Sequence, residues 1–189
     1  MNNNRIRYIL ALALICCQFP ARAQDGSSAY SFMNITASSK IYGLGGVNIS
    51  LVDDDLMSAD QNPALLGQEM SQQVALNYMH YMGGSNFAGL RYAHSAGERG
   101  AWSATINYFG YGSMKETDVA GNIIGDFSPK DVIFGGSYSH DITDNLRGGI
   151  SLKMLYSGYA DYTAFAVATD LGINYYKPEN DMSLSLTVA

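Results

Sequence analysis

Cysteine occurs at only one place in this 189-residue chain, at Cys16 and Cys17. These residues end an unbroken apolar run, Tyr8–Cys17, which follows a positively charged start and precedes small residues. This is the pattern of a secretory signal peptide, so we expect residues 1–23 to be removed. The remaining chain, residues 24–189, then lacks cysteine, which excludes a disulfide framework, a thiol nucleophile and a thiolate metal site.

Positive charge is also scarce. Three of the 11 basic residues, Arg5, Arg7 and Arg22, would leave with the signal peptide, so eight would remain against 17 acidic residues. This balance excludes nucleic acid as a partner, because nucleic-acid binding requires a basic surface. No stretch of 18 apolar residues follows the signal peptide, so we expect no membrane-spanning helix.

Catalytic signatures are missing as well. No GxSxG motif occurs, and the GLGG run at residues 43–46 lacks the following Lys-Ser or Lys-Thr of a phosphate loop. His80, His94 and His140 fall near the ends of expected strands, and none is paired at ligand spacing. We therefore expect no enzyme, and no catalytic, cofactor-binding or metal site.

From residue 72 onward, apolar and polar side chains alternate with a period of two. In residues 146–156 the even positions are apolar or glycine, and the odd positions include Arg147, Ser151 and Lys153. Successive side chains of a strand point to opposite faces, so each such segment predicts a strand with one apolar face. The pattern predicts an all-β antiparallel fold with one short helix near 54–61. The expected strands are 41–51, 72–82, 86–95, 101–109, 131–140, 146–156, 162–176 and 182–188.

Two architectures fit this alternation. A soluble β-sandwich buries its apolar faces, whereas an outer-membrane β-barrel turns them towards lipid. Several expected strands reach the length of about 9–11 residues that a tilted strand needs to cross the hydrocarbon. Tyrosines gather near strand ends, as in the aromatic girdles of such barrels, although tyrosine also favours strands in general. We therefore favour an outer-membrane β-barrel of about eight strands, present here as a partial barrel.

Loop lengths have a parity that fits a barrel, with short periplasmic turns alternating with longer outer loops. The short polar connections are expected at every second hairpin, at residues 97–100, 141–145 and 177–181. The longest of the other connections is 111–130, in which Ala120-Gly121-Asn122 predicts a small hairpin over residues 119–126. Because of its length, loop 111–130 is our candidate docking surface.

Two polar clusters require interpretation. Arg91, Arg147, Lys153 and Asp170 fall on the expected polar face. In a barrel we expect them to line the lumen and neutralise one another, and a site for an anionic ligand is the alternative.

The second cluster is Asp53-Asp54-Asp55, which lacks the alternate spacing and the following glycine of an EF-hand loop. An aspartate at this position would cap the short helix, and Asn62-Pro63 would stop it. We predict a structural corner rather than a metal site or a catalytic site, made by Asp53, Asp54, Asp55, Asn62, Pro63 and Ala64.

Several of these segments together resemble the start of the PorQ family of the type IX secretion system, found in Bacteroidetes. The segments are YSFMN at 30–34, GLGGVNISL at 43–51, DDDL at 53–56 and QNPALL at 61–66. The related PorV family shares the Asn-Pro-Ala corner, and both families are similar to FadL-type barrels. PorQ-like proteins are longer, so the resemblance implies that residues 24–189 are a truncated barrel domain matching their N-terminal part.

The resemblance implies a non-enzymatic, Sec-exported component of the Gram-negative outer membrane. It would anchor or dock the complex that processes cargo and attaches it to the cell surface. The implied partners are PorZ, the PorU sortase, PorV and outer-membrane lipid, with no cofactor. One alternative is a FadL-like transporter of hydrophobic small molecules, with a hatch formed by residues 24–52. A secreted soluble β-sandwich is the other.

Overall fold

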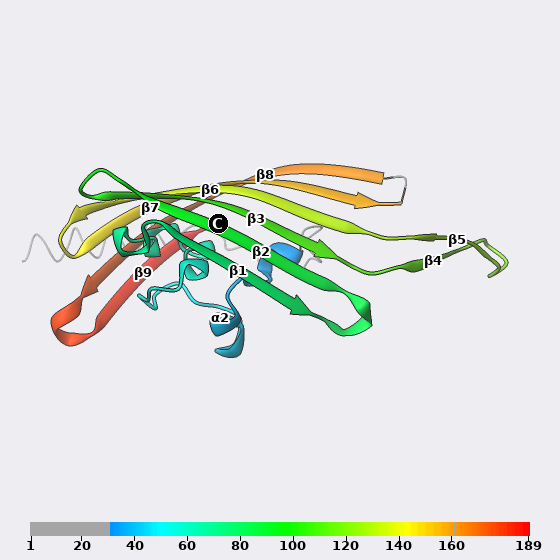
Figure 1. The fold of residues 1–189 in the computed structure, drawn as a ribbon, viewed down its shortest axis with the longest axis horizontal. Helices are drawn as coiled ribbons and strands as arrows, with labels where there is room; N and C mark the ends of the chain where they lie inside the picture. Colours follow the sequence, from blue (N-terminus) through cyan, green and yellow to red (C-terminus); the bar gives the residue numbers. More distant parts are fainter. Residues whose placement is uncertain (1–30, 161) are drawn as a thin grey trace, which may run out of the picture. The chain divides into compact units, whose positions relative to one another are not determined.

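Seven strands form one antiparallel sheet in the computed structural model, which describes residues 31–160 and 162–189 (Figure 1). The strand order is β1-β2-β3-β6-β7-β8-β9. The bounds are Gln73–His80 for β1, Asn86–Ala96 for β2, Gly100–Gly110 for β3, Lys130–Thr143 for β6, Leu146–Tyr159 for β7, Tyr162–Lys177 for β8 and Met182–Val188 for β9. Strands β4 (Met114–Thr117) and β5 (Ile123–Phe127) form a separate hairpin. The expected signal peptide lies outside the described residues.

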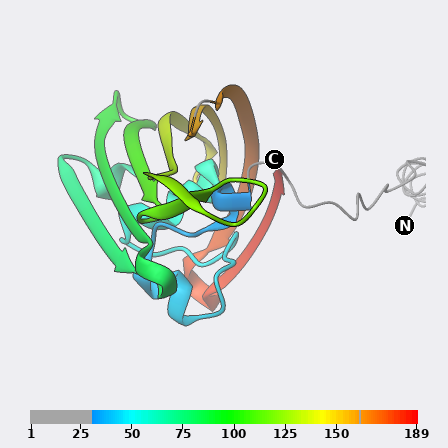
Figure 2. The ribbon, with the colours of Figure 1, turned by 90° about the vertical axis from the view of Figure 1, so that its right-hand side faces the viewer.

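The seven-stranded sheet is curved, and its strands surround a concave side (Figure 2). At the two ends of the strand order, β1 and β9 each pair with one neighbour within the described residues, so the sheet is open. Residues 32–189 form one compact unit. The expected all-β antiparallel fold is confirmed in this open form, as a partial barrel.

The sheet exposes its apolar face. Residues paired in register share a face of a sheet, and one such row joins five strands from β2 to β8. Its side chains are between 44% and 59% exposed; they are Leu90, Ile106, Phe134, Met154 and Val167. A sheet with one solvated face normally exposes its polar side instead.

The opposite, concave face is polar and buried. One register row on this face runs from Ala93 in β2 through three serines to Asp170 in β8. All five residues are buried, and the three serines are Ser103, Ser137 and Ser151. The polar residues of this sheet are therefore shielded from solvent, while its apolar residues are not.

The segment before β1, which we call the strap (residues 35–72), covers the concave face (Figure 1). It contains helix α2 (Ser39–Gly43) and the 3-10 helices η2 (Leu56–Asp60), η3 (Pro63–Leu65) and η4 (Gln68–Met70). The other 3-10 helices are η1 (Ser31–Asn34), η5 (Met82–Gly84) and η6 (Pro178–Asn180). None of the helices in the described part of the chain is long and apolar enough to span a membrane.

A small apolar core joins the strap to the sheet. Leu56, Leu66 and Met70 from the strap pack with Ala93 of β2 and Ala101 of β3. Burial of side chains such as leucine stabilises a fold by about 1.5–3 kcal/mol each. The strap is therefore an integral layer of this unit.

The predicted first strand over residues 41–51 is wrong. Helix α2 occupies the start of this segment, and the Ser38 hydroxyl caps it by accepting the N–H of Ile41. Gly45 and Gly46 then have φ angles of +111° and +87°. Glycine reaches this left-handed region without the penalty that a side chain brings, and extended strands do not use it. The glycine-rich run that suggested a strand is a turn.

Candidate functional site on the polar face of the sheet

The Asn-Pro-Ala corner lies at the centre of the strap. Asn62 is fully buried and caps η3, because its Oδ1 accepts the N–H of Ala64 at 3.0 Å. Its Nδ2 donates to the carbonyl of Ile49 at 2.6 Å. Pro63 takes the first helical position, where its missing N–H costs nothing. Asn62 thus satisfies two backbone groups and fixes the direction of the strap.

Two glycines of the sheet form a seat for this corner. Gly149 of β7 and Gly172 of β8 are register partners on the concave face. A Cβ atom on Gly149 would lie 2.4 Å from the carbonyl carbon of Pro63, and one on Gly172 would lie 2.0 Å from Oδ1 of Asn62. Only glycine leaves room for so close an approach of two backbones. The sequence pattern missed this seat because glycine at a strand position identifies no contact partner.

Buried charges hold the strap beside the corner. Nη2 of Arg91 lies 2.9 Å from Oδ1 of Asp60, at the end of η2, and Arg91 is only 1% exposed. Nζ of Lys153 donates to the backbone carbonyl of Asp60 at 3.0 Å and lies 2.8 Å from Oδ2 of Asp170. Asp170 also accepts the hydroxyl of Ser151. The four charges sum to zero, which lowers the penalty for burying them.

The structure separates the four candidate lumen charges into different environments. Lys153 and Asp170 pair with each other, whereas Arg91 pairs with Asp60, a strap residue that the sequence pattern did not single out. Arg147 lies apart from these, near the turn between β6 and β7. The sequence pattern placed charges on one face but contained no information on which charges the strap supplies.

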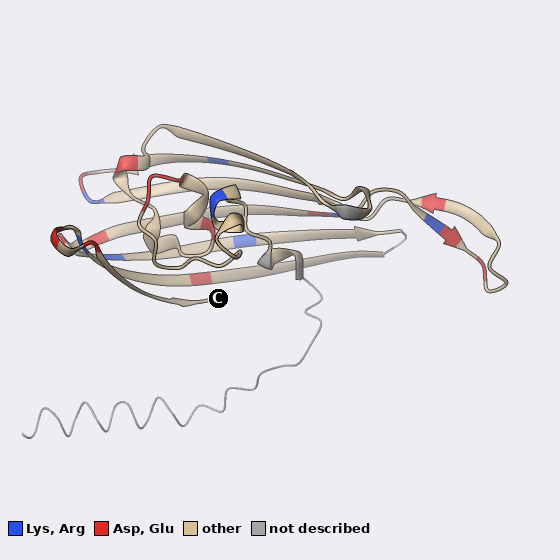
Figure 3. Cartoon of the chain, turned by 90° about the horizontal axis from the view of Figure 1, so that it is seen from below, with Lys and Arg blue, Asp and Glu red and all other residues tan. Residues whose placement is uncertain are grey.

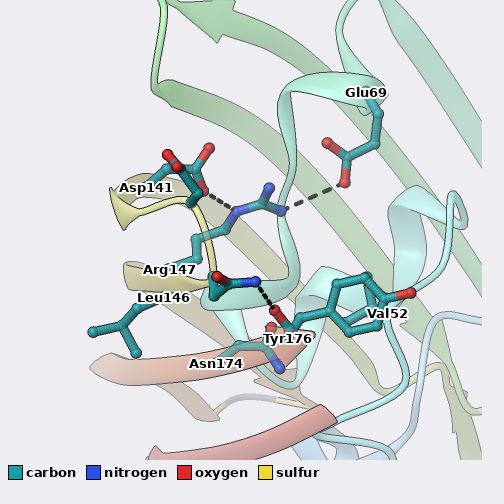
Figure 4. Close-up of a pocket in the computed structure, with 9 residues that line it drawn as sticks. Val52, Glu69, Asp141, Leu146, Arg147, Asn174 and Tyr176 are labelled. Carbon is teal, nitrogen blue, oxygen red and sulfur yellow. Dashed lines mark hydrogen bonds and ion pairs between the residues drawn. The ribbon is translucent and has the colours of Figure 1, made fainter. Parts of the chain in front are cut away.

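Arg147 lines a small pocket of about 200 Å³ at that end of the sheet (Figure 4). Its Nε donates to Asp141 at 2.5 Å, and its Nη1 lies 3.5 Å from Glu69 of the strap. Asn145 Nδ2 donates to the Tyr176 carbonyl at 3.0 Å. Acidic side chains thus occupy the positions around Arg147 that an anion would need, which disfavours an anionic ligand there.

The three aspartates have different contacts. Oδ1 of Asp55 caps η2 by accepting the N–H of Met57 at 3.0 Å, and its other oxygen accepts the hydroxyl of Ser38. Asp53 pairs with Lys40 and accepts the N–H of Asp54. The hydrogen bond from Lys40 holds the pKa of Asp53 below its usual value. The run therefore ties η2 to the α2 segment.

These side chains hold two parts of the structure together. Among the residues that the structure describes, no group of three or more His, Cys, Asp or Glu could hold a metal ion. The four buried charges beneath the strap, Arg91, Asp60, Lys153 and Asp170, are already paired with one another or with backbone carbonyls. The arrangement is suited to locking the strap against β2, β7 and β8.

Comparison with known proteins gives no family assignment. No protein-family model matches the sequence. No curated protein matches it either.

Proposed function

We propose that this chain is a β protein of the Gram-negative outer membrane and a non-enzymatic, PorQ-like component of the type IX secretion system. The observation that carries the proposal is the orientation of the sheet, whose apolar face is exposed and whose polar face is buried. Within its seven strands, Lys130 and Lys177 are the only Asp, Glu, Lys or Arg residues at outward positions; Lys130 is the first residue of β6 and Lys177 is the last residue of β8. An apolar exterior with charges only at strand termini, around a polar interior, is the arrangement of a lipid-embedded β protein.

The aromatic residues of the outward face support the same proposal. Tyr78, Tyr108 and Tyr156 fall in one register row across the sheet. Towards the other end, Trp102 of β3 and Tyr138 of β6 are register partners on the same face. Two aromatic groups separated by an apolar band are typical of barrels with a girdle at each membrane interface.

The proposed role within the secretion system rests on the resemblance to PorQ. The residues of the Asn-Pro-Ala corner, which carry most of that resemblance, are those that pack into the glycine seat. The chain would act as a membrane anchor and docking platform for the surface complex that attaches cargo. PorZ, the PorU sortase and PorV are the proposed partners.

Leu152→Arg tests the membrane placement. Leu152 lies on the outward face and is 47% exposed. Arginine on the lipid-facing side costs about 2–4 kcal/mol near the bilayer centre, whereas an exposed substitution in a soluble protein changes stability by about 0.5 kcal/mol or less. We expect the variant to lose insertion, measured by outer-membrane fractionation and by gels with and without boiling. Thr117→Arg in the hairpin is the control and should insert normally.

Recovery of both variants in the aqueous fraction would refute the membrane placement and favour the soluble β-sandwich. The secretion role has its own test, in a Bacteroidetes cell that carries the type IX system. The tagged chain should co-purify with PorZ, PorU or PorV from detergent-solubilised outer membranes. Normal insertion without any of these partners would reject that role alone.

A cavity supports a second candidate function, that of a FadL-like transporter. It measures about 280 Å³ and lies between the strap and the sheet. Met33, Val47 and Ile49 give it an apolar wall, and Lys153 lies on its polar side. A hydrophobic molecule recovered in lipid extracts of the purified protein, and absent after Val47→Trp, would favour this candidate.

A further inference from the structure

The hairpin formed by β4 and β5 (residues 114–127) extends beyond the end of the sheet, as Figure 3 shows. It exposes several apolar side chains. Val119 at the tip is fully exposed, and Ile123 and Ile124 are 58% and 62% exposed. Exposed apolar groups concentrated on one projecting element are typical of an interaction surface.

The tip of the hairpin is held by a dense set of hydrogen bonds. Oδ1 of Asp118 accepts the N–H groups of Ala120 and Asn122, at 2.9 Å and 2.8 Å. Gly121 takes the left-handed conformation that the turn requires, with a φ angle of +86°. The side-chain amide of Asn122 donates to Oδ2 of Asp118 and holds the pKa of Asp118 below its usual value. The turn therefore keeps its shape at neutral pH.

The base of the hairpin is fixed to the sheet. The hydroxyl of Tyr111 donates to the buried Asp131 of β6 at 2.5 Å, and the hydroxyl of Tyr159 donates to the same oxygen at 3.3 Å. Burial raises the pKa of Tyr111, so its hydroxyl remains a donor at neutral pH. The N–H of Tyr111 donates to the carbonyl of Pro129, closing the two ends of the connection. A surface held at both base and tip loses little entropy when it binds.

The charges of the hairpin indicate the chemistry of its partner. Lys115 and Asp126 have opposite charges and are register partners. Glu116 and Asp118 remain beside the apolar tip, so the hairpin carries a net charge of −2. Such a surface is repelled by anionic lipid head groups and is complementary to a basic rim.

We infer that the hairpin is a preorganised docking arm for a protein surface in which an apolar pocket is bordered by Lys or Arg side chains. Ile123 and Ile124 supply the apolar anchor, and Glu116 supplies the charge that meets the basic border. The inference rests on the proposed role of the chain as a membrane-bound docking platform, and it defines the surface and the partner chemistry of that role.

The test uses the full-length chain in outer membranes, with a photo-crosslinking amino acid in place of Val119. The probe residue in place of Glu98, an exposed position in the turn between β2 and β3, is the control. We expect an adduct at position 119 only, and mass spectrometry should identify its peptide as part of a protein surface rich in Lys or Arg. Glu116→Lys should lower the adduct yield at least fivefold, and Glu98→Lys should leave it unchanged.

Binding of the identified partner provides the second measurement. The purified partner should bind the wild-type chain at least tenfold more tightly than the Ile124→Ser variant. Three results would overturn the inference and leave the membrane placement standing. They are an adduct with lipid, an adduct yield that Glu116→Lys leaves unchanged, and no adduct from a chain that is inserted, as judged by gels with and without boiling. Recovery of the chain only in the aqueous fraction would overturn the proposed function, and the inference with it.

Discussion

Alanine at Gly149 is expected to displace the Asn-Pro-Ala corner from the sheet. The added Cβ would lie 2.4 Å from the carbonyl carbon of Pro63 and 2.5 Å from the backbone nitrogen of Ala64. Both obstacles are backbone atoms, so neither can rotate away as a side chain could. Overpacking of this kind lowers the free energy of unfolding by about 1–3 kcal/mol.

Gly136→Ala provides a matched control. Gly136 lies on the outward face of β6, and a Cβ added there would have no atom within 4 Å. We would measure the free energy of unfolding of both variants by urea titration in detergent micelles. Release of the strap would be followed separately by the rate of tryptic cleavage after Lys40, which is exposed in α2.

The expected result is a loss of stability and faster cleavage for Gly149→Ala, with neither change for Gly136→Ala. Gly172→Ala should behave similarly, because its Cβ would collide with the amide of Asn62. The double variant should cost less than the sum of the single variants, since either one already displaces the same corner. If Gly149→Ala and Gly136→Ala had equal unfolding midpoints and equal cleavage rates, the close contact between Gly149 and the Asn-Pro-Ala corner would be refuted.

Three further predictions concern ionisable groups. Asp60→Asn leaves the buried Arg91 without its anion, which should lower the free energy of unfolding by about 3–5 kcal/mol in urea titrations. The pKa of Asp53 is lowered by Lys40, so this contact stabilises the strap above the ordinary aspartate pKa of 3.8 and is lost as the pH falls through the lower folded value. The rate at which pepsin cleaves the strap should therefore rise as the pH falls below 3.8. Asp53→Asn should remove this pH dependence of the cleavage rate. Burial raises the pKa of Tyr81 to about 12, so stability from its neutral form is present below pH 10 and is lost as the pH rises through 12. Ultraviolet titration should show one late-ionising tyrosine fewer in Tyr81→Phe.

Each of these predictions has a clear negative result. Asp144→Asn removes an exposed ion pair with Arg99, which contributes about 1 kcal/mol at most. If Asp60→Asn is no more damaging than Asp144→Asn, the buried pair does not hold the strap. Acid-dependent cleavage that persists in Asp53→Asn, or an unchanged titration curve for Tyr81→Phe, would contradict the environments described for those two groups.

The strands of the sheet were largely predictable from the sequence. Successive side chains of a strand point to opposite faces, so the alternation of apolar and polar residues can be recognised within each segment without knowing its partners. Residues 41–51 were the exception, because Gly45 and Gly46 favour positive φ angles that the alternation does not report. The alternation also left open which face is outward, since a sandwich and a barrel share it. The structure answers this by showing the strap on the polar face.

The candidate site was much less predictable. The caps of the corner are local, so an aspartate of the 53–55 run could be assigned as the cap of a short helix from its position. Asn62 was predicted only to stop that helix, and the structure shows that it also caps η3. The contacts of Gly149 and Gly172 join segments far apart in the chain, and nothing near either glycine in the sequence indicates its partner. The same holds for Arg91, whose partner Asp60 lies in the strap.

The position of the strap at the start of the chain has a consequence for the order of folding. The hydrogen bond from Lys153 to Asp60 joins residues 93 positions apart, and the seat requires β7 and β8 to be paired. Contacts of such long sequence separation form late, because the intervening chain must first lose its conformational freedom. The strap therefore leaves the ribosome before every strand it contacts, and the glycine seat can receive the corner only after β7 and β8 have paired. Protection of Lys40 from trypsin would mark the completion of the sheet, and any defect in β7 or β8 would leave the strap accessible.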